Sequence, residues 1–307
     1  MPATDRASSS KVIQCVPNFS EGRRPDVVGE IARALRSGGS KVIDSSLDPD
    51  HNRSVITFIG DPDSIRKSAL AGVGKAVELI DMRSHHGAHP RVGAVDVIPI
   101  VPIRNVTMQD CVDLSCEIGA AIADEFRIPV YFYEESANAE HRRNLANIRR
   151  GGYEKLVKGR LDRDRTPDLG PDIAHPTAGA TIIGARGPLI AFNVDLRTSD
   201  FALAQRIAAE IRRCRDEGRG MAGVKAMAVD LVSRGIVQVS TNITQPDKTT
   251  MYDVYDFVRG RAEKAGVEIE RSELIGAVRL DDTVRSAAES MKLEGFDETR
   301  IVDWWLE

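Results

Sequence analysis

The spacing of apolar residues along this chain alternates between the pattern of strands and the pattern of helices. The same order of strands and helices occurs twice. Short apolar or alternating runs predict strands, and apolar residues three or four apart predict helices between them. The first set comprises strands at 11–17, 41–46, 54–60 and 93–101, with helices that begin at Pro25 and Pro62. The second set comprises strands at 189–196, 224–232, 237–244 and 267–275, with helices after Asp200 and at 251–265. Each set reads strand–helix–strand–strand–helix–strand, which is the ferredoxin-like order. We therefore predict an α+β fold of two ferredoxin-like subdomains with a cleft between them.

The stretch between the two sets predicts further elements. Thr107 and Asp110 have the spacing of a capping box, which marks a helix start. We predict that this helix ends near Phe126. A strand at 129–133, a helix at 137–150 and a loop at 151–176 are predicted to follow. A further helix is predicted near the end of the chain, at 283–291. The Gly-rich stretch 218–223 follows a helix and precedes a strand, so it is predicted to be a connector. We predict a disordered tail at 1–10 and subdomains at 11–185 and 186–307.

Charge and hydropathy exclude several classes of protein. The chain has 42 Lys and Arg against 46 Asp and Glu, so its net charge of −4 argues against a nucleic-acid partner. The longest apolar run is residues 97–103, much shorter than the roughly 20 residues of a membrane helix, so we expect no membrane partner. Its 4 cysteines are scattered, and the first ten residues lack the apolar core of a signal peptide, so we expect a cytoplasmic protein.

Histidines are concentrated in one predicted loop. Three of the 6 histidines, at 85, 86 and 89, lie within residues 83–91 between two arginines. Imidazole exchanges protons near neutral pH, so this loop suits acid–base chemistry on an anionic substrate. Two other interpretations stay open. His85 and His89 have a spacing that can bind zinc on a helix, although Gly87 and Pro90 disfavour a helix there, and the segment can also be a polar surface loop.

Two further polar stretches invite a functional interpretation. Residues 48–53 place two carboxylates, an imidazole, an amide and a guanidinium in the predicted turn between two strands, although Asp, Pro and Asn also favour turns for backbone reasons. Residues 141–165 carry nine Lys and Arg against three acids. This basic stretch is either a solvated surface or an electrostatic guide for a ligand with several carboxylates.

Several segments together resemble the glutamate formimidoyltransferases, the folate-dependent enzymes of histidine breakdown. The resembling segments are residues 15–22, 52–55, 79–82, 86–97, 179–181, 184–186, 189–193 and 238–242, in the order that the family has. The resemblance implies two ferredoxin-like subdomains, a homodimer and, as co-substrate, tetrahydrofolate without a metal. The chain departs from the family at Ser46, Ala178 and Ala277–Arg279, and it ends where some relatives continue into a cyclodeaminase half.

The resemblance also implies roles for individual residues. His89, in the His-Pro-Arg motif, corresponds to the catalytic histidine. The folate segment corresponds to Gly170, Pro171, Asp172, Ile173, Ala174, His175, Pro176, Thr177, Ala178 and Gly179. The candidate substrate-binding residues are Asn18, Asp48, Asp50, Asn52, Arg53, Arg91, Asp96 and Arg186.

The implied reaction moves a formimino group from N-formimino-L-glutamate to N5 of tetrahydrofolate. One imidazole can remove the proton from N5 and then protonate the leaving amine, and we predict that His89 does so. A carboxylate of Asp48, Asp50 or Asp96 can stabilise the amidinium cation, and Arg53, Arg91 or Arg186 can bind substrate carboxylates. Two alternatives stay open: a related transferase that uses N-formylglutamate, and a folate-binding protein without turnover.

Overall fold

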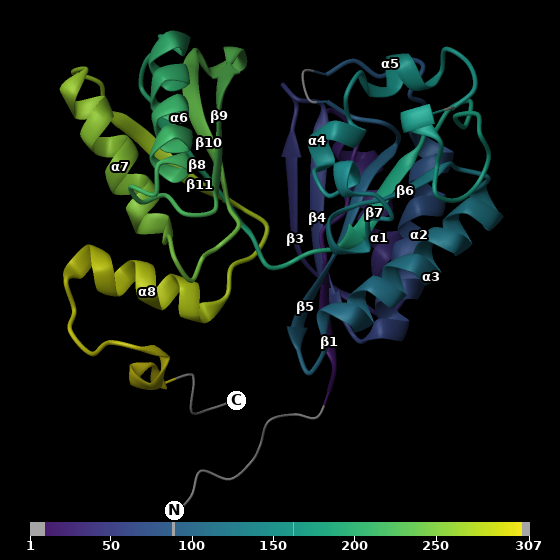
Figure 1. Cartoon of the computed structure of the whole chain (residues 1–307), viewed down its shortest axis with the longest axis horizontal. Coiled ribbons are helices and arrows are strands. Elements are labelled where there is room, and N and C mark those ends of the chain that lie inside the picture. Colours follow the sequence, from purple (N-terminus) through teal and green to yellow (C-terminus); the bar gives the residue numbers. More distant parts are fainter. Residues whose placement is uncertain (1–9, 88–89, 162, 303–307) are drawn as a thin grey trace, which may run out of the picture. The chain divides into compact units, whose positions relative to one another are not determined.

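The structure of this protein is a computed structural model that describes residues 10–87, 90–161 and 163–302. The chain divides into two compact units, unit 1 at residues 1–187 and unit 2 at residues 188–307 (Figure 1). Among the residues that the structure describes, none of the helices combines the length and the apolar content that crossing a bilayer needs.

Unit 1 contains a seven-stranded mixed sheet. Its main elements are β1 (Val12–Cys15), β2 (Asn18–Phe19), α1 (Pro25–Ser37), β3 (Lys41–Asp48), β4 (Arg53–Gly60), α2 (Pro62–Leu79), β5 (Val95–Arg104), α3 (Met108–Phe126), β6 (Val130–Phe132) and β7 (Thr181–Ala185). The strands follow the order β1-β4-β2-β5-β7-β6, and β3 pairs with the outer side of β4. The elements β1-α1-β3-β4-α2-β5 confirm the predicted ferredoxin-like order. Strand β7 has no counterpart in the predictions, and it extends the sheet by pairing in parallel with β5 and β6.

The chain between β6 and β7 is the part of unit 1 that differs most from expectation. The helix predicted at 137–150 is wrong: this region forms the short helical turns Glu134–Ser136 and Glu140–Arg142 and one turn of helix, α4 (Leu145–Ile148), followed by α5 (Gly152–Leu156). The Asn144 side chain caps the start of α4, and Gly151, with a φ of 92°, precedes α5 as its N-cap, so capping and turn residues divide the stretch into short helices in spite of its helical spacing.

Both faces of the unit 1 sheet are covered. Helices α1, α2 and α3 pack on one face around a core that includes Ile13, Phe58 and Ile118. On the other face, Leu156 and Leu161 pack against Tyr131, Ile182 and other side chains of β5, β6 and β7. The segment that joins β6 to β7 therefore brings its polar residues close to the start of β5.

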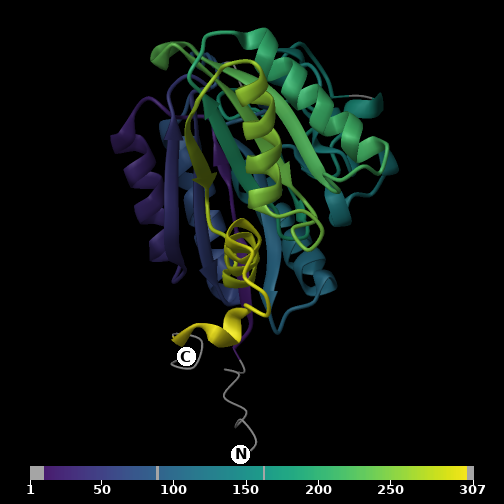
Figure 2. The same cartoon turned by 90° about the vertical axis from the view of Figure 1, so that its left-hand side faces the viewer.

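Unit 2 is a ferredoxin-like domain with a four-stranded antiparallel sheet. Its elements are β8 (Ile190–Leu196), α6 (Phe201–Asp216), β9 (Val224–Leu231), β10 (Ile236–Ile243), α7 (Met251–Lys264), β11 (Ile269–Ile275) and α8 (Leu280–Met291). The strand order is β11-β8-β10-β9, and α6 and α7 lie side by side on one face of this sheet (Figures 1 and 2). The predicted order of unit 2 is confirmed, and residues 218–223 connect α6 to β9 as expected. The predicted cleft between the subdomains stays a prediction.

Candidate functional site

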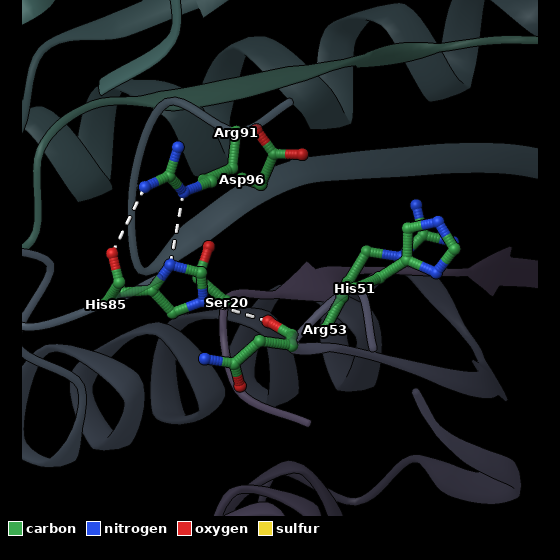
Figure 3. Close-up of a pocket in the computed structure, with 7 residues that line it drawn as sticks. Ser20, His51, Arg53, His85, Arg91 and Asp96 are labelled. Atoms are coloured by element: carbon green, nitrogen blue, oxygen red, sulfur yellow. Dashed lines mark hydrogen bonds between the residues drawn. The ribbon is translucent and has the colours of Figure 1, made fainter. Parts of the chain in front are cut away.

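Three loops of unit 1 meet at the end of its sheet where β4 and β5 begin. They are the β2–α1 loop with Ser20, the β3–β4 hairpin, and the α2–β5 segment that holds the histidines. Their side chains line one pocket (Figure 3), formed by Ser20, His51, Asn52, Arg53, His85, Arg91 and Asp96. A second pocket, with an empty volume of about 500 Å³, adjoins it because Ser20, Asn52 and His85 line both.

Two glycines allow these loops to approach so closely. A Cβ added at Gly22 would collide with the Asp48 carbonyl, and a Cβ added at Gly87 would collide with the His51 carbonyl. Both positions bring backbone against the β3–β4 hairpin, which is a use to which glycine is suited.

Asp96 reaches the pocket through an irregularity in β5. Asn18 pairs with Val97 and Phe19 pairs with Val95, so Asp96 is the extra residue of a β-bulge. Bulges commonly redirect a side chain beside a site. Asp96 is 1% exposed, and its carboxylate accepts hydrogen bonds from the Val92 N–H (2.9 Å) and from Nη2 of Arg149 (2.5 Å).

Arg53 is a half-buried cation beside this pair. It stands opposite Asp48 in the β3–β4 register. Burial and the nearby Arg149 guanidinium lower the pKa of Arg53 to about 10, against the opposing effect of Asp96 and Asp48. Two guanidinium groups thus lie close together in a region of reduced solvation, which favours the approach of an anion.

Asp48 and His51 form a carboxylate–imidazole pair in the hairpin. Asp48 accepts from the His51 backbone N–H (2.8 Å) and lies 2.5 Å from its Nδ1. Although burial opposes the change, these hydrogen bonds from His51 lower the pKa of Asp48. The carboxylate therefore fixes the orientation of the His51 ring.

Asn52 connects all three loops. Its Oδ1 accepts from the Gly22 N–H (3.0 Å), and its Nδ2 donates to the His86 carbonyl (3.0 Å). Its own carbonyl lies 2.9 Å from Nε2 of His85. Asn52 is buried and has a φ of 49°, a left-handed conformation that asparagine tolerates better than most residues.

His85 uses both ring nitrogens in these contacts. Arg91 Nε donates to Nδ1 of His85 (3.1 Å), and a guanidinium can only donate, so Nδ1 accepts and Nε2 carries the hydrogen given to Asn52. Burial and the Arg91 charge lower the pKa of His85, which favours this neutral tautomer. Arg91 continues to Glu154 through an ion pair of 2.6 Å. His85 is thus part of the framework of the pocket.

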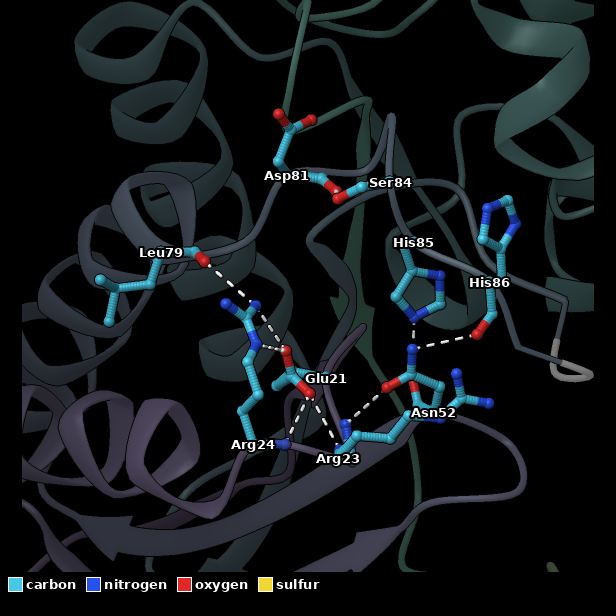
Figure 4. Close-up of polar contacts among 10 residues, drawn as sticks. Glu21, Arg23, Arg24, Asn52, Leu79, Asp81, Ser84, His85 and His86 are labelled. Carbon is cyan, nitrogen blue, oxygen red and sulfur yellow. Dashed lines mark hydrogen bonds and ion pairs between the residues drawn. The ribbon is translucent and has the colours of Figure 1, made fainter.

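Glu21 organises the second pocket (Figure 4). Its buried carboxylate accepts from the backbone N–H groups of Arg23 and Arg24, both at 2.9 Å, and from Nε of Arg24 at 2.6 Å. Arg24 also donates to the Leu79 carbonyl (3.2 Å) at the end of α2. This network fixes the β2–α1 loop against the start of the histidine segment.

The predicted folate segment borders the same loops. The Thr177 carbonyl accepts from Met82 N–H and the Ala178 carbonyl from Ala94 N–H, each at 2.8 Å. His175 holds the turn, since its Nδ1 accepts from the Ala178 N–H at 3.0 Å, and burial lowers its pKa. Residues 177–178 therefore bind the chain on both sides of the histidine segment.

The structure gathers some of the predicted residues and separates others. Asn52, Arg53, Arg91 and Asp96 line the first pocket, and Asp48 is bound to His51 at its edge. Asn18 hydrogen-bonds to Val16, Asp50 lies in the hairpin turn, and Arg186 follows β7 beside Cys15 and Tyr133; they line neither pocket. His89, the predicted catalytic residue, lies outside the described residues.

Several site residues had no individual role in the sequence predictions, although His51 and His85 lie in stretches that those predictions singled out. Ser20, Glu21, His51, His85, Arg149 and Glu154 all belong to the two pockets or contact their lining. The only sequence signal for Arg149 and Glu154 was the basic stretch 141–165. That stretch is divided in the structure, because Arg149 binds Asp96 and the buried Arg142 binds Asp168 at 2.6 Å, whereas Arg150 is exposed. Across residues 10–87, 90–161 and 163–302, no three His, Cys, Asp or Glu side chains gather as a metal site would require.

Comparison with known proteins identifies the family. Residues 12–186 match the model of the formiminotransferase domain, N-terminal subdomain, and residues 191–301 match the model of the formiminotransferase domain. A glutamate formimidoyltransferase of Streptococcus pyogenes is 41% identical over 289 residues, which are 94% of this chain and 96% of the relative. One of Thermoplasma acidophilum is 42% identical over 299 residues, 96% of this chain and 97% of the relative. The formimidoyltransferase-cyclodeaminase of Rattus norvegicus is 38% identical over 283 residues, 91% of this chain and 52% of the relative. The chain therefore belongs to the formiminotransferase family.

Proposed function

We propose that this chain is a glutamate formimidoyltransferase, which moves the formimino group of N-formimino-L-glutamate to N5 of tetrahydrofolate in histidine degradation. The observation that carries this proposal is the 41% and 42% identity, over 94% and 96% of the chain, to two relatives of that name. The anionic substrates suit a pocket that contains Arg53 beside Arg149.

The reaction requires two proton transfers, one at each of the two nitrogens that exchange places on the formimino carbon. N5 attacks the formimino carbon, the N5–C bond forms, and N5 loses its proton. The bond from that carbon to the glutamate nitrogen then breaks, and this nitrogen gains a proton. A single imidazole that accepts the first proton and returns it as the second balances the reaction without an outside acid or base.

We assign this proton transfer to His89. The resemblance supports the assignment, and the contacts of its neighbours favour it. His85 cannot exchange a proton without losing a hydrogen bond to Asn52 or Arg91. His86 is exposed and reaches the framework through its carbonyl oxygen.

Charged side chains of the pocket supply the remaining roles. Arg53 is the first choice for binding a substrate carboxylate. The guanidinium of Arg91 is already bound to Glu154 and His85, and Arg186 lines neither pocket. A bound carboxylate would also offset the repulsion between Arg53 and Arg149. Three acids are candidates for stabilising the amidinium cation, and this role stays a proposal for each of them. Asp48 contacts His51, Asp96 contacts Arg149, and Asp50 lies in the turn of the β3–β4 hairpin.

Residues 170–179 are proposed to bind folate, since they border the histidine segment through Met82 and Ala94. Tetrahydrofolate acts as a co-substrate, and the proposed reaction needs no metal. The homodimer and the cytoplasmic location stay predictions that rest on the resemblance and on the composition.

A comparison of donors tests this function. Purified chain is incubated with tetrahydrofolate and either N-formimino-L-glutamate or N-formyl-L-glutamate, and the folate product and released glutamate are measured. Formimino transfer in preference to formyl transfer is expected. Transfer from the formyl donor alone would instead identify the related formyltransferase, and tetrahydrofolate binding without turnover of either donor would identify a folate-binding protein.

A further inference from the structure

Arg91 and His85, which flank residues 88–89 in the sequence, contact each other directly. Arg91 donates through Nε to the ring of His85 (3.1 Å) and through Nη2 to the His85 carbonyl (3.2 Å). These two residues are six positions apart. The described residues on each side of positions 88–89 are therefore joined by side-chain contacts (Figure 3), and we call this junction of His85, His86 and Arg91 the neck.

Each side of this neck is attached to a different element. On one side, Asn52 binds both the His85 ring and the His86 carbonyl, and its Oδ1 binds the Gly22 N–H (Figure 4). On the other side, Arg91 binds Glu154 through its guanidinium, and its carbonyl accepts from the Tyr153 N–H (2.8 Å). The β3–β4 hairpin and α5 thus hold the neck from two directions.

The bonding of Asn52 is that of a framework residue. Its Oδ1, Nδ2 and carbonyl oxygen are each bonded within the chain, and the residue is 8% exposed. A buried amide with this many backbone partners fixes geometry, because moving it would leave several polar groups unpaired. Its amide keeps one N–H and one oxygen lone pair, but at 8% exposure little of the residue is open to a substrate.

We propose that Asn52 and His85 are positioning residues that fix the neck, and with it the two described ends of the sequence that carries His89, rather than residues that bind the substrate. This inference rests on the proposed function for the role of His89. Small misplacements of a catalytic group cost large factors in rate, so fixing the neck is expected to act on kcat.

The test begins with three asparagine variants of the full chain, and two variants of His85 follow. Asn52→Gly removes the amide yet tolerates the positive φ, and Asn52→Asp keeps an acceptor for Gly22 but loses the donor for His86. Asn105→Gly is the matched control, since Asn105 has a φ of 53° and is exposed in the turn after β5. For each variant, kcat per folded molecule and both KM values are measured, with the folded fraction taken from circular dichroism.

Asn52→Gly and Asn52→Asp are each expected to lower kcat about 10- to 100-fold and to change KM less than about threefold, whereas Asn105→Gly keeps the wild-type kcat. His85→Gln, whose amide can still donate to the Asn52 carbonyl, should retain more activity than His85→Ala. Full activity of Asn52→Asp would show that only the Gly22 contact matters and would overturn the proposal. A raised KM for formiminoglutamate at unchanged kcat would show substrate binding and would overturn it too.

Hydrogen exchange separates this proposal from the proposed function. If the wild-type chain transfers no formimino group, the proposed function fails, and positioning is then judged by exchange alone. Peptides that span 83–94 should exchange faster in Asn52→Gly than in wild type, with no such change in Asn105→Gly. Unchanged exchange in Asn52→Gly would refute the positioning role whatever the activity.

Discussion

Among the described strand residues, each unit buries one aspartate in its sheet, and the two carboxylates differ in their hydrogen-bond partners. Asp195 in β8 of unit 2 is 0% exposed, and Asp96 in β5 of unit 1 is 1% exposed. Asp195 has a partner directly opposite on each neighbouring strand, Gln238 of β10 and Arg271 of β11, and the register with β11 shifts between Ile269 and Arg271. It accepts from Gln238 (2.8 Å), Arg271 (3.0 Å) and Arg234 (2.6 Å).

Asp96 instead depends on residues that lie outside the regular ladder. The bulge in β5 removes it from the register, and its partners are the Val92 N–H and Arg149, which follows α4. Arg149 in turn lies near Arg53, which lines the pocket. The contrast shows that one fold can bury a carboxylate as part of the sheet in one unit and as part of a pocket in the other, because Asp195 faces partners on both neighbouring strands, whereas Asp96 is itself the extra residue of a bulge.

The largest expected effect belongs to unit 1. His89→Asn should lower kcat for formimino transfer by roughly two to four powers of ten at saturating tetrahydrofolate, because it removes the proposed acid–base group. The matched control is His141→Asn, which changes an exposed histidine of the same unit. Near-normal turnover of His89→Asn would remove this residue from the mechanism.

Replacing each buried aspartate by asparagine tests the contrast directly. Asp195→Asn leaves Arg234 and Arg271 without their shared anion, and we expect it to lower the free energy of urea unfolding by about 3 kcal/mol. Asp96→Asn breaks the charge pairing with Arg149, and we expect kcat to fall at least about tenfold, as for a lost charge-assisted hydrogen bond.

The two measurements are made on both variants, with kcat normalised to the folded fraction. The contrast holds if Asp96→Asn has the larger loss of kcat and Asp195→Asn has the larger loss of stability. The reverse order would mean that the ladder in unit 2 serves the reaction and that the bulge in unit 1 is structural.

Sequence reasoning reached the regular parts of both units and missed what depends on distant contacts. The two ferredoxin-like orders follow from local spacing, as does the capping box at Thr107. Strand β7 escaped because a five-residue apolar run has no readable period and its partners, β5 and β6, are far away in sequence. The same holds for the site: residues such as Arg53 and Asp96 were predicted, but the basic stretch 141–165 did not indicate that Arg149 pairs with Asp96, which lies 53 positions away.

The pH dependence of stability should also differ between the units. Burial and Arg91 lower the pKa of His85 from its ordinary value of 6.5, and Glu21, Arg23 and Glu154 also face it. Below pH 6.5 the unfolded chain therefore binds a proton that the folded chain does not, so unit 1 loses stability as the pH falls through this window. Unit 2 contains no histidine. In spite of burial, hydrogen bonds from Gln238, Arg234 and Arg271 lower the pKa of Asp195 below its ordinary value of 3.8. The contribution of Asp195 to the stability of unit 2 is therefore lost only below about pH 4.

Hydrogen exchange at pH 7, 6 and 5, corrected for the intrinsic rate, measures this difference peptide by peptide. Core peptides of unit 1 should lose protection before those of unit 2, and His85→Gln should reduce the pH dependence of unit 1. Equal losses in both units would contradict the assignment of this effect to the buried histidine.

The smallest expected effects come from two helix caps that have the same sequence pattern, one in each unit. Thr107 and Thr250 both form a capping box with an aspartate three residues later, at the start of α3 and α7. Thr107 is exposed, so Thr107→Ala should lower the free energy of unfolding by about 1 kcal/mol. Thr250 is 5% exposed and also hydrogen-bonds to Glu289 of α8, so Thr250→Ala should lower it by about 2 kcal/mol. Urea unfolding of the two variants measures both values, and Thr250→Ser, which keeps the hydroxyl, serves as the control. Equal costs would show that the contact with α8 adds nothing to the cap, so that the two units would differ in their buried aspartates but not in how their helices begin.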